Sequence, residues 1–232
     1  MITNQDLLIE HLAKWLAEYA KAAGRSVFVV GFDGARSDAL LLHICSKATE
    51  NYGGLATHAL SFPTSTIEIK NVFNGNVTYS IDSIKNPGYY YLQCHEIAHD
   101  HGIVVGPVDR TFGLYYRSYG KRAAGSADVF PLFDLEYSEI VEITDSLWPG
   151  LWPVESTDIV ADIEFCNEAE AMFGIITCEE SPHRHPRWPY FIHTQKAMIA
   201  KVHQREKLTR HKKMNKPYPS LSDKPQLYRR VR

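Results

Sequence analysis

The stretch SVFVVGFDGARSDALLLHICSKAT, residues 26–49, decides the fold of this sequence. Residues 26–31 are apolar, rich in valine and end in a glycine, which predicts a short strand buried on both faces. Residues 37–49 then carry apolar side chains at helical spacing. A buried strand joined to a helix by a short loop is typical of a parallel sheet whose strands alternate with helices.

The alternation of helices and strands continues on both sides of this unit. Residues 5–22 place large apolar side chains along one helical stripe, and residues 89–101 also have a helical pattern. Residues 56–61 and 103–106 predict further short strands. We therefore expect an α/β fold with a doubly wound, mainly parallel sheet of about five strands and helices on both faces.

One segment between these elements predicts a β-hairpin. Residues 67–73 (IEIKNVF) and 77–81 (VTYSI) are both strand-like. The dipeptide Asn74-Gly75 separates them, and Asn-Gly is a strong signal for a two-residue hairpin turn. We expect these two pieces to pair with each other.

The composition indicates a reducing compartment and no membrane span. At 232 residues the chain is long enough for one domain with a sizeable core. The four cysteines lie far apart without a CxxC pair, which excludes a zinc ribbon and a secreted disulfide scaffold. Neither an export signal nor a run of about 18 apolar residues is present. We expect a cytoplasmic location.

The charge of the chain is unevenly distributed. Residues 201–232 hold eleven Lys or Arg against two acids, a net of +9, whereas the whole chain carries −2. Such a basic segment suits phosphates, nucleic acid or an acidic partner surface, or is simply a solvated segment. The charge alone leaves these alternatives open.

The loop between the first strand and the following helix is the candidate ligand site. It reads GFDGARSD, residues 31–38. Backbone N–H groups and the positive end of a helix make an anion site at such a junction, and ligands of parallel sheets bind at the carboxyl ends of the strands. The loop is not a Walker A motif, because no GK[ST] follows.

This loop and a later segment resemble those of the ammonia-dependent NAD synthetases. That family has the loop pattern SGGxDS followed by AL, where the present chain has DGARSD followed by AL. Residues 103–142, IVVGPVDRTFGLYYRSYGKRAAGSADVFPLFDLEYSEIVE, are similar to the family's VIGTxNxTE...GYFTKYGDGGADxxPIxDLYKTEVxE, and residues 209–213 are similar to its terminal xxHKR element. The resemblance covers roughly residues 5–219.

The resemblance implies an adenine nucleotide alpha hydrolase-like fold with a PP-loop, in one NAD synthetase-like domain over residues 1–219 and a basic tail over 220–232. It also implies the reaction. ATP adenylates the carboxylate of nicotinic acid adenine dinucleotide, and ammonia then displaces AMP to give NAD. Members of the family are homodimers that use Mg²⁺. We expect the dinucleotide and ATP as ligands and do not expect a nucleic-acid partner.

The resemblance assigns site residues position by position. The implied ATP-binding residues belong to the loop: Gly31, Asp33, Gly34, Ala35, Arg36, Ser37 and Asp38. The implied substrate-binding residues lie later in the chain: Thr111, Tyr119, Asp128, Glu139, His211 and Lys212. A shift of one residue in the loop makes Asp38 the candidate metal ligand. The sequence does not identify a catalytic residue.

The sequence also departs from the family at charged positions. Asp33 stands where the family has serine, Phe112 where it has a metal-binding glutamate, and Tyr137 where it has a lysine. Because adenylyl transfer depends on neutralising charge, losses of this kind cost on the order of a thousandfold or more in rate. The candidate replacements are Arg36, Asp38, Asp109, Arg110 and Arg117. A second hypothesis is therefore a catalytically silent or repurposed homologue that binds a nucleotide or a protein partner.

A competing motif gives a third hypothesis. Residues 95–99 read HEIAH, the HExxH pattern that places two zinc-binding imidazoles and a glutamate base on one helical face. The HxxGxxH extension is absent, since position 105 is valine. A zinc hydrolase using His95, Glu96 and His99 is the more distant alternative. A second histidine cluster, His183, His185 and His193, suits a surface or a dimer contact.

Overall fold

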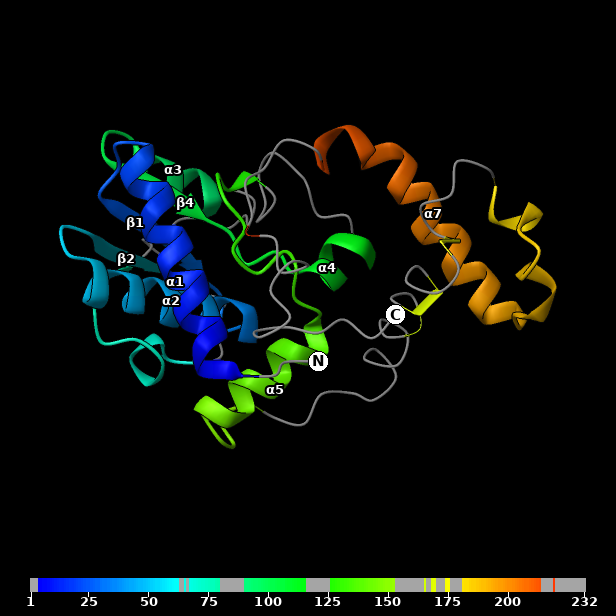
Figure 1. The fold of residues 1–232 in the computed structure, drawn as a ribbon, viewed down its shortest axis with the longest axis horizontal. Coiled ribbons are helices and arrows are strands. Elements are labelled where there is room, and N and C mark those ends of the chain that lie inside the picture. The colour runs from blue at the N-terminus through cyan, green and yellow to red at the C-terminus, as the bar shows by residue number, and fades with distance from the viewer. Residues whose placement is uncertain are drawn as a thin grey trace.

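The computed structural model describes residues 4–62, 65, 67–79, 90–115, 126–152, 165, 168–169, 174–175, 181–213 and 219. Strands and helices alternate through the first two thirds of the chain, and a long helix lies near its end (Figure 1). The helices are α1 (Gln5–Ala22), α2 (Arg36–Tyr52), α3 (Tyr90–Ala98), α4 (Arg110–Tyr115), α5 (Tyr137–Leu147) and α7 (His193–Lys213). The strands are β1 (Val27–Phe32), β2 (Ala56–Ser61), β3 (Asn76–Tyr79) and β4 (Gly102–Val105), and short 3₁₀ turns are η1 (Ile69–Asn71), η4 (Pro182–Arg184) and η5 (Trp188–Tyr190).

The described strands form one parallel sheet in the order β3-β2-β1-β4. In the register of this sheet, Val30 lies beside Ala59 of β2 on one side and beside Val105 of β4 on the other. An isolated parallel bridge between Val105 and Val129 continues the sheet beyond β4. The predicted parallel sheet is confirmed, with four described strands and this bridge where we expected about five strands.

Helices cover both faces of the sheet, as the prediction of a doubly wound fold required. Alternate residues of β1 point to opposite faces, so Phe28 and Val30 pack into the core formed with α1 and α2. Val29 packs on the other face with Cys94 of α3. Because both faces are buried, the strand is apolar at every position from Phe28 to Val30.

The first helix forms where its periodicity predicts it. The side chain of Asn4 caps α1 by accepting a hydrogen bond from the backbone N–H of Leu7 at 3.0 Å. The apolar stripe of the helix is buried, with Leu8 and Leu16 both fully shielded from solvent. α1 lies along α2, and its buried side chains share one core with those of β1.

The predicted hairpin at residues 67–81 is wrong. The first piece contains the 3₁₀ turn η1, and β3 pairs in parallel with β2 instead of pairing with residues 67–73. Gly75 does not have a positive φ, which a type I′ turn needs at both central positions. A glycine is needed at position 75 because the ring of Phe73 lies close to it: a Cβ there would lie 2.2 Å from Cζ of Phe73.

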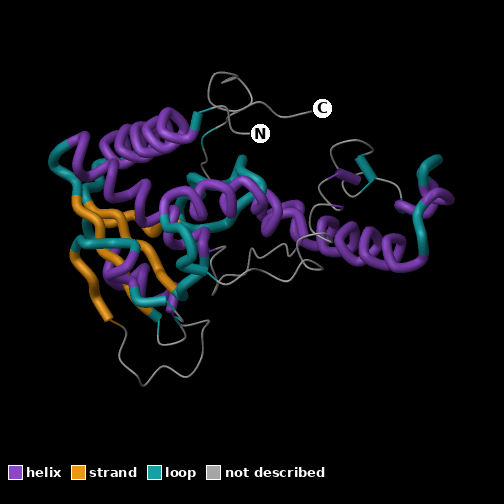
Figure 2. The backbone as a smooth tube through the Cα atoms, turned by 90° about the horizontal axis from the view of Figure 1, so that it is seen from below, coloured by secondary structure: helices purple, strands orange, loops and turns teal. Residues whose placement is uncertain are grey.

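The end of the described chain lies apart from the sheet. α7 extends away from the sheet and its covering helices (Figure 2). It packs through Ile199 and Val202 against Ala169 and Ile175, and this apolar cluster is separate from the two clusters at the sheet. Among the described residues, no helix combines the length and the apolar character needed to cross a membrane. The division at residue 219 stays a prediction, and residues 220–232 lie outside the described residues.

Candidate functional site

The β1–α2 loop lies at the carboxyl-terminal edge of the sheet, at the point where the strand order reverses. β2 follows β1 on one side of the sheet and β4 lies on its other side. The loop after β1 and the loop after β4 therefore leave the same edge side by side. In open parallel sheets this reversal point is where ligands bind. The structure thus places the predicted ATP-binding loop where such a site is expected.

The loop backbone is held by its own carboxyl groups. The side chain of Asp33 accepts a hydrogen bond from the backbone N–H of Ala35 at 3.0 Å. The side chain of Asp38 accepts one from the backbone N–H of Asp33 at 2.9 Å. Gly34 has a φ of 97°, a conformation that other residues adopt only with strain. In an anion-binding loop the N–H groups of Asp33 and Ala35 would donate to the ligand. Here they donate to two carboxyl groups of the loop itself.

Most of the predicted ATP-binding residues are buried. Gly31, Gly34 and Ser37 are all shielded from solvent. Asp33 and Ala35 are the exposed residues among the seven predicted for the loop. A ligand at this edge would therefore meet the Asp33 carboxylate first.

Burial disfavours the ionised form of the Asp38 carboxyl group. Burial raises the pKa of Asp38 well above its ordinary range, and the charge of Asp33 and a hydrogen bond from its side chain raise it further. The side chain is 3% exposed. Burial also raises the pKa values of Tyr91 and Cys94, and their proximity to Asp38 adds to both shifts. Asp38 thus points inward, toward α3.

Replacing Asp38 by asparagine is expected to remove one source of pH dependence in stability. A folded-state pKa above the ordinary value of about 3.9 means that the native state binds more protons, so wild-type stability falls as pH rises through this window. One proton gives a slope of at most about 1.4 kcal/mol per pH unit. In urea unfolding between pH 4 and 7, the free energy of unfolding of D38N should increase relative to that of the wild type as pH rises. The control variant Asp6→Asn, at an exposed site, should show the same pH dependence of stability as the wild type. The same result for D38N would contradict a raised pKa of Asp38.

The described residues do not fit a magnesium ion. Mg²⁺ is held by carboxylate oxygens, and a neutral carboxyl group bound to a backbone N–H is a poor ligand. Burial disfavours the ionised form of Asp38, and its carboxyl group accepts from the backbone N–H of Asp33. Within the described part of the chain, no three His, Cys, Asp or Glu residues come together in a way that could hold a metal. The assignment of Asp38 as a metal ligand is therefore not supported by its geometry.

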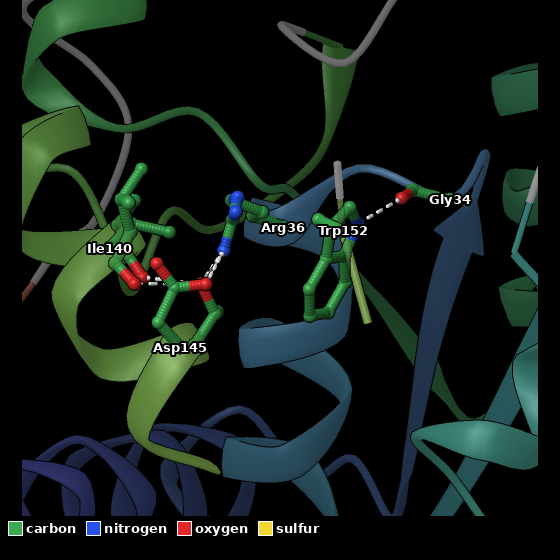
Figure 3. Close-up of polar contacts among 7 residues, drawn as sticks. Gly34, Arg36, Ile140, Asp145 and Trp152 are labelled. Atoms are coloured by element: carbon green, nitrogen blue, oxygen red, sulfur yellow. Dashed lines mark hydrogen bonds and ion pairs between the residues drawn. The ribbon is translucent and has the colours of Figure 1, made fainter. Parts of the chain in front are cut away.

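Arg36 is directed away from the loop, toward α5. Its guanidinium donates to Oγ1 of Thr144 at 3.0 Å and forms an ion pair with Asp145 at 2.5 Å (Figure 3). It also lies over the ring of Trp152, 5.0 Å from the ring centroid. The side chain of Arg36 is 4% exposed. Its charge therefore neutralises Asp145 at the end of α5.

Trp152 contacts the loop directly, and no sequence pattern predicted this contact. The indole N–H of Trp152 donates to the carbonyl oxygen of Gly34 at 2.9 Å. In Figure 3 its side chain lies between Gly34 and Arg36. The rings of Trp148 and Trp152 meet edge to face at 6.0 Å, and both side chains are half-buried. The bond to Gly34 spans 118 residues, beyond the reach of any local pattern.

Two predicted substrate-binding residues lie together at the start of α5. The hydroxyl of Thr111 accepts a hydrogen bond from the backbone N–H of Tyr137 at 3.0 Å. Glu139 accepts one from the backbone N–H of Glu136 at 3.0 Å, as half of a capping box. Both side chains are buried. They cap the helix, and their roles toward a substrate stay predictions.

Only some of the other predicted positions lie among the described residues. Asp128 is exposed, and its carboxylate accepts a hydrogen bond from the backbone N–H of Val104 at 2.9 Å. Of the candidate replacements, Arg110 pairs with Glu136 at 3.3 Å and Asp109 is buried. Tyr119 and Arg117 lie outside the described residues, as do the side chains of His211 and Lys212 on α7.

The HEIAH motif does not form the arrangement that HExxH requires. α3 ends at Ala98, so His99 follows the helix and does not share its last turn. His99 is 81% exposed, and its Nδ1 lies 2.8 Å from the carboxylate of Asp100. In the second histidine cluster, the His183 ring packs edge-on against Trp188 at 4.4 Å. Tyr190 nearby is 79% exposed, which suits the predicted surface position.

Comparison with known proteins relates this fold to one group of enzymes. No family model and no curated protein matches the sequence. The NH3-dependent NAD synthetase from Campylobacter jejuni aligns with 89% of this chain and 96% of its own, at 14% identity and a TM-score of 0.63. The NMN synthetase from Francisella tularensis aligns with 94% of this chain and 99% of its own, at 16% identity and a TM-score of 0.62. The NAD+ synthetase from Burkholderia pseudomallei aligns with 90% of each chain, at 14% identity and a TM-score of 0.52. This chain therefore has the fold of the NAD synthetases.

Proposed function

We propose that this protein is an NAD synthetase-type ligase that binds ATP at the β1–α2 loop and converts the carboxylate of nicotinic acid adenine dinucleotide into an amide. The observation that carries the proposal is the position of this loop, at the start of a helix and at the reversal point of a parallel sheet. The similarity in fold to synthetases of NAD and NMN also supports the proposal.

The reaction has two steps. A carboxylate oxygen of the dinucleotide attacks the α-phosphorus of ATP, and the bond to the pyrophosphate leaving group breaks. Ammonia then attacks the carbonyl carbon of the acyl adenylate, and AMP leaves with one oxygen of the original carboxylate. The nitrogen loses a proton to solvent, and the product is the amide.

The loop would support the first step through its backbone. We expect a phosphate to accept a hydrogen bond from the backbone N–H of Ala35. In the structure this N–H donates to the carboxylate of Asp33. ATP would have to displace that carboxylate, so the Asp33 side chain and the phosphate compete for one position. The positive end of α2 favours either anion.

Replacing Asp33 by serine is expected to strengthen ATP binding about fivefold. The change removes an exposed negative charge beside the phosphates, and two unit charges 4 Å apart in water repel by about 1 kcal/mol. Serine keeps an oxygen that can accept from Ala35, so the turn is retained. Calorimetric titration with ATP measures the dissociation constant. D100N, at the opposite edge of the sheet, is the matched control, and an unchanged or weaker affinity of D33S would count against ATP at this loop.

The product assay tests the proposed function as a whole. The pure protein is incubated with ATP, magnesium, ammonium and nicotinic acid adenine dinucleotide, and pyrophosphate and NAD are followed. A parallel arm uses the corresponding mononucleotide carboxylate, because one structural neighbour is an NMN synthetase. The proposal expects pyrophosphate and amide in equal amounts. Absence of pyrophosphate in both arms contradicts it.

A second candidate is a nucleotide-binding protein without ligase chemistry. It is favoured by the loop's own carboxyl groups, which hold two of its N–H donors, and by the lack of a metal site among the described residues. This candidate predicts ATP binding by calorimetry together with no pyrophosphate release. A protein that releases pyrophosphate rules it out.

A further inference from the structure

The β1–α2 loop is anchored from outside by a segment that the proposed chemistry does not use. Trp152 donates its indole N–H to the carbonyl oxygen of Gly34 at 2.9 Å. This contact ties the loop to the turn that follows α5. Trp152 and Gly34 face each other directly in Figure 3.

The anchor fixes the direction of one backbone donor. The carbonyl of Gly34 and the N–H of Ala35 belong to the same peptide unit, and in a trans peptide they point in opposite directions. Trp152 holds the carbonyl on one side, so the N–H is presented on the other side. There it meets the carboxylate of Asp33 at 3.0 Å. Because Gly34 is a glycine with a φ of 97°, its own conformational preference does not prevent this peptide from turning over.

Trp152 is itself held in place. The guanidinium of Arg36 lies over its ring at 5.0 Å, and the same guanidinium is fixed by Thr144 and Asp145 of α5. The indole therefore has little freedom to leave Gly34.

We infer that Trp152 is a positioning residue of the candidate ligand site, which orients the Gly34–Ala35 peptide so that the Ala35 N–H faces the anion position. The inference rests on the proposed function in so far as that anion is the phosphate of ATP. The orientation of the peptide itself can be tested without any ligand.

The test compares Trp152→Phe with Trp148→Phe in the full-length protein. Both changes remove an indole from the same turn and keep an aromatic ring, but only the first removes the bond to Gly34. Amide hydrogen exchange at residues 33–38 is measured alongside that of β1, and ATP affinity is measured by calorimetry. W152F should exchange at the loop about three- to tenfold faster, the effect of one hydrogen bond, with β1 unchanged. Its affinity for ATP should fall by a similar factor, while W148F stays within about twofold of the wild type.

The possible outcomes separate this inference from the proposed function. Equal loop exchange in W152F and W148F overturns the inference, as does faster exchange throughout β1, which would indicate a merely structural role. Faster loop exchange in W152F alone supports it. A wild type that binds no ATP contradicts the proposed function, and the exchange result still decides whether Trp152 orients the peptide.

Discussion

Replacing Arg36 by alanine is expected to lower the free energy of unfolding by about 3 kcal/mol, because it removes a buried side chain together with its ion pair. The side chain of Arg36 is 4% exposed and contacts Thr144, Asp145 and the ring of Trp152. Its partner Asp145 is 53% exposed and can return to water, which keeps the cost below that of stranding a buried charge. Urea unfolding at pH 7 measures the loss.

The matched control for this change is Lys47→Ala on the same helix. Lys47 pairs with Glu50 at 3.4 Å, and both side chains are well exposed. Such surface pairs contribute about 0–1 kcal/mol, so K47A should stay within about 0.5 kcal/mol of the wild type. A loss for R36A as small as that for K47A would show that the contacts of Arg36 with α5 and Trp152 do not stabilise the protein.

The second large effect concerns Gly31, the penultimate residue of β1. A Cβ at Gly31 would lie 2.4 Å from Cζ of Phe62, closer than real contacts allow. The Phe62 ring cannot simply move aside, because it stacks on Tyr90 at 4.4 Å and meets Tyr91 at 6.0 Å. Gly31→Ala is therefore expected to cost about 2 kcal/mol by overpacking.

A double-mutant cycle tests the cause of this cost. Phe62→Ala alone should lower stability by about 3 kcal/mol, since the ring is buried. In the F62A background the added methyl group has room, so G31A should then cost less than about 0.5 kcal/mol. Unfolding of the four proteins in urea gives the coupling energy. If the losses of stability in G31A and F62A were additive, contact with the Phe62 ring would not be the cause of the cost of G31A.

Local patterns in the sequence predicted the elements that build the sheet. The buried strand before the loop, the helix after it and the helix at residues 5–22 lie where their periodicities predicted them. These elements are predictable because burial of each face depends on residues within the element itself. The hairpin at Asn74-Gly75 failed for the opposite reason. Gly75 is needed for contact with Phe73 and not for a tight turn, which a dipeptide signal does not distinguish.

The chemistry of the site depends on contacts between distant residues, so it was less predictable. A shift of one residue against the family's loop pattern made Asp38 the candidate metal ligand, yet tertiary burial disfavours its ionised form and its side chain holds the loop backbone. Arg36 was a candidate to compensate Asp33, but it pairs with Asp145, 109 residues away. Trp152 had no predicted role at all. For Arg36 and Trp152, the contact joins residues that lie 109 and 118 positions apart, which no local pattern associates with each other.

The transfer of a labelled oxygen tests the proposed ligase most directly. Nicotinic acid adenine dinucleotide with both carboxylate oxygens replaced by ¹⁸O is incubated with the protein, ATP, magnesium and ammonium, and the AMP is analysed by mass spectrometry. Adenylation of the carboxylate predicts AMP that carries one ¹⁸O atom, formed together with NAD. Unlabelled AMP, or no AMP while ATP still binds, would contradict the account and leave a nucleotide-binding protein with the fold of a synthetase.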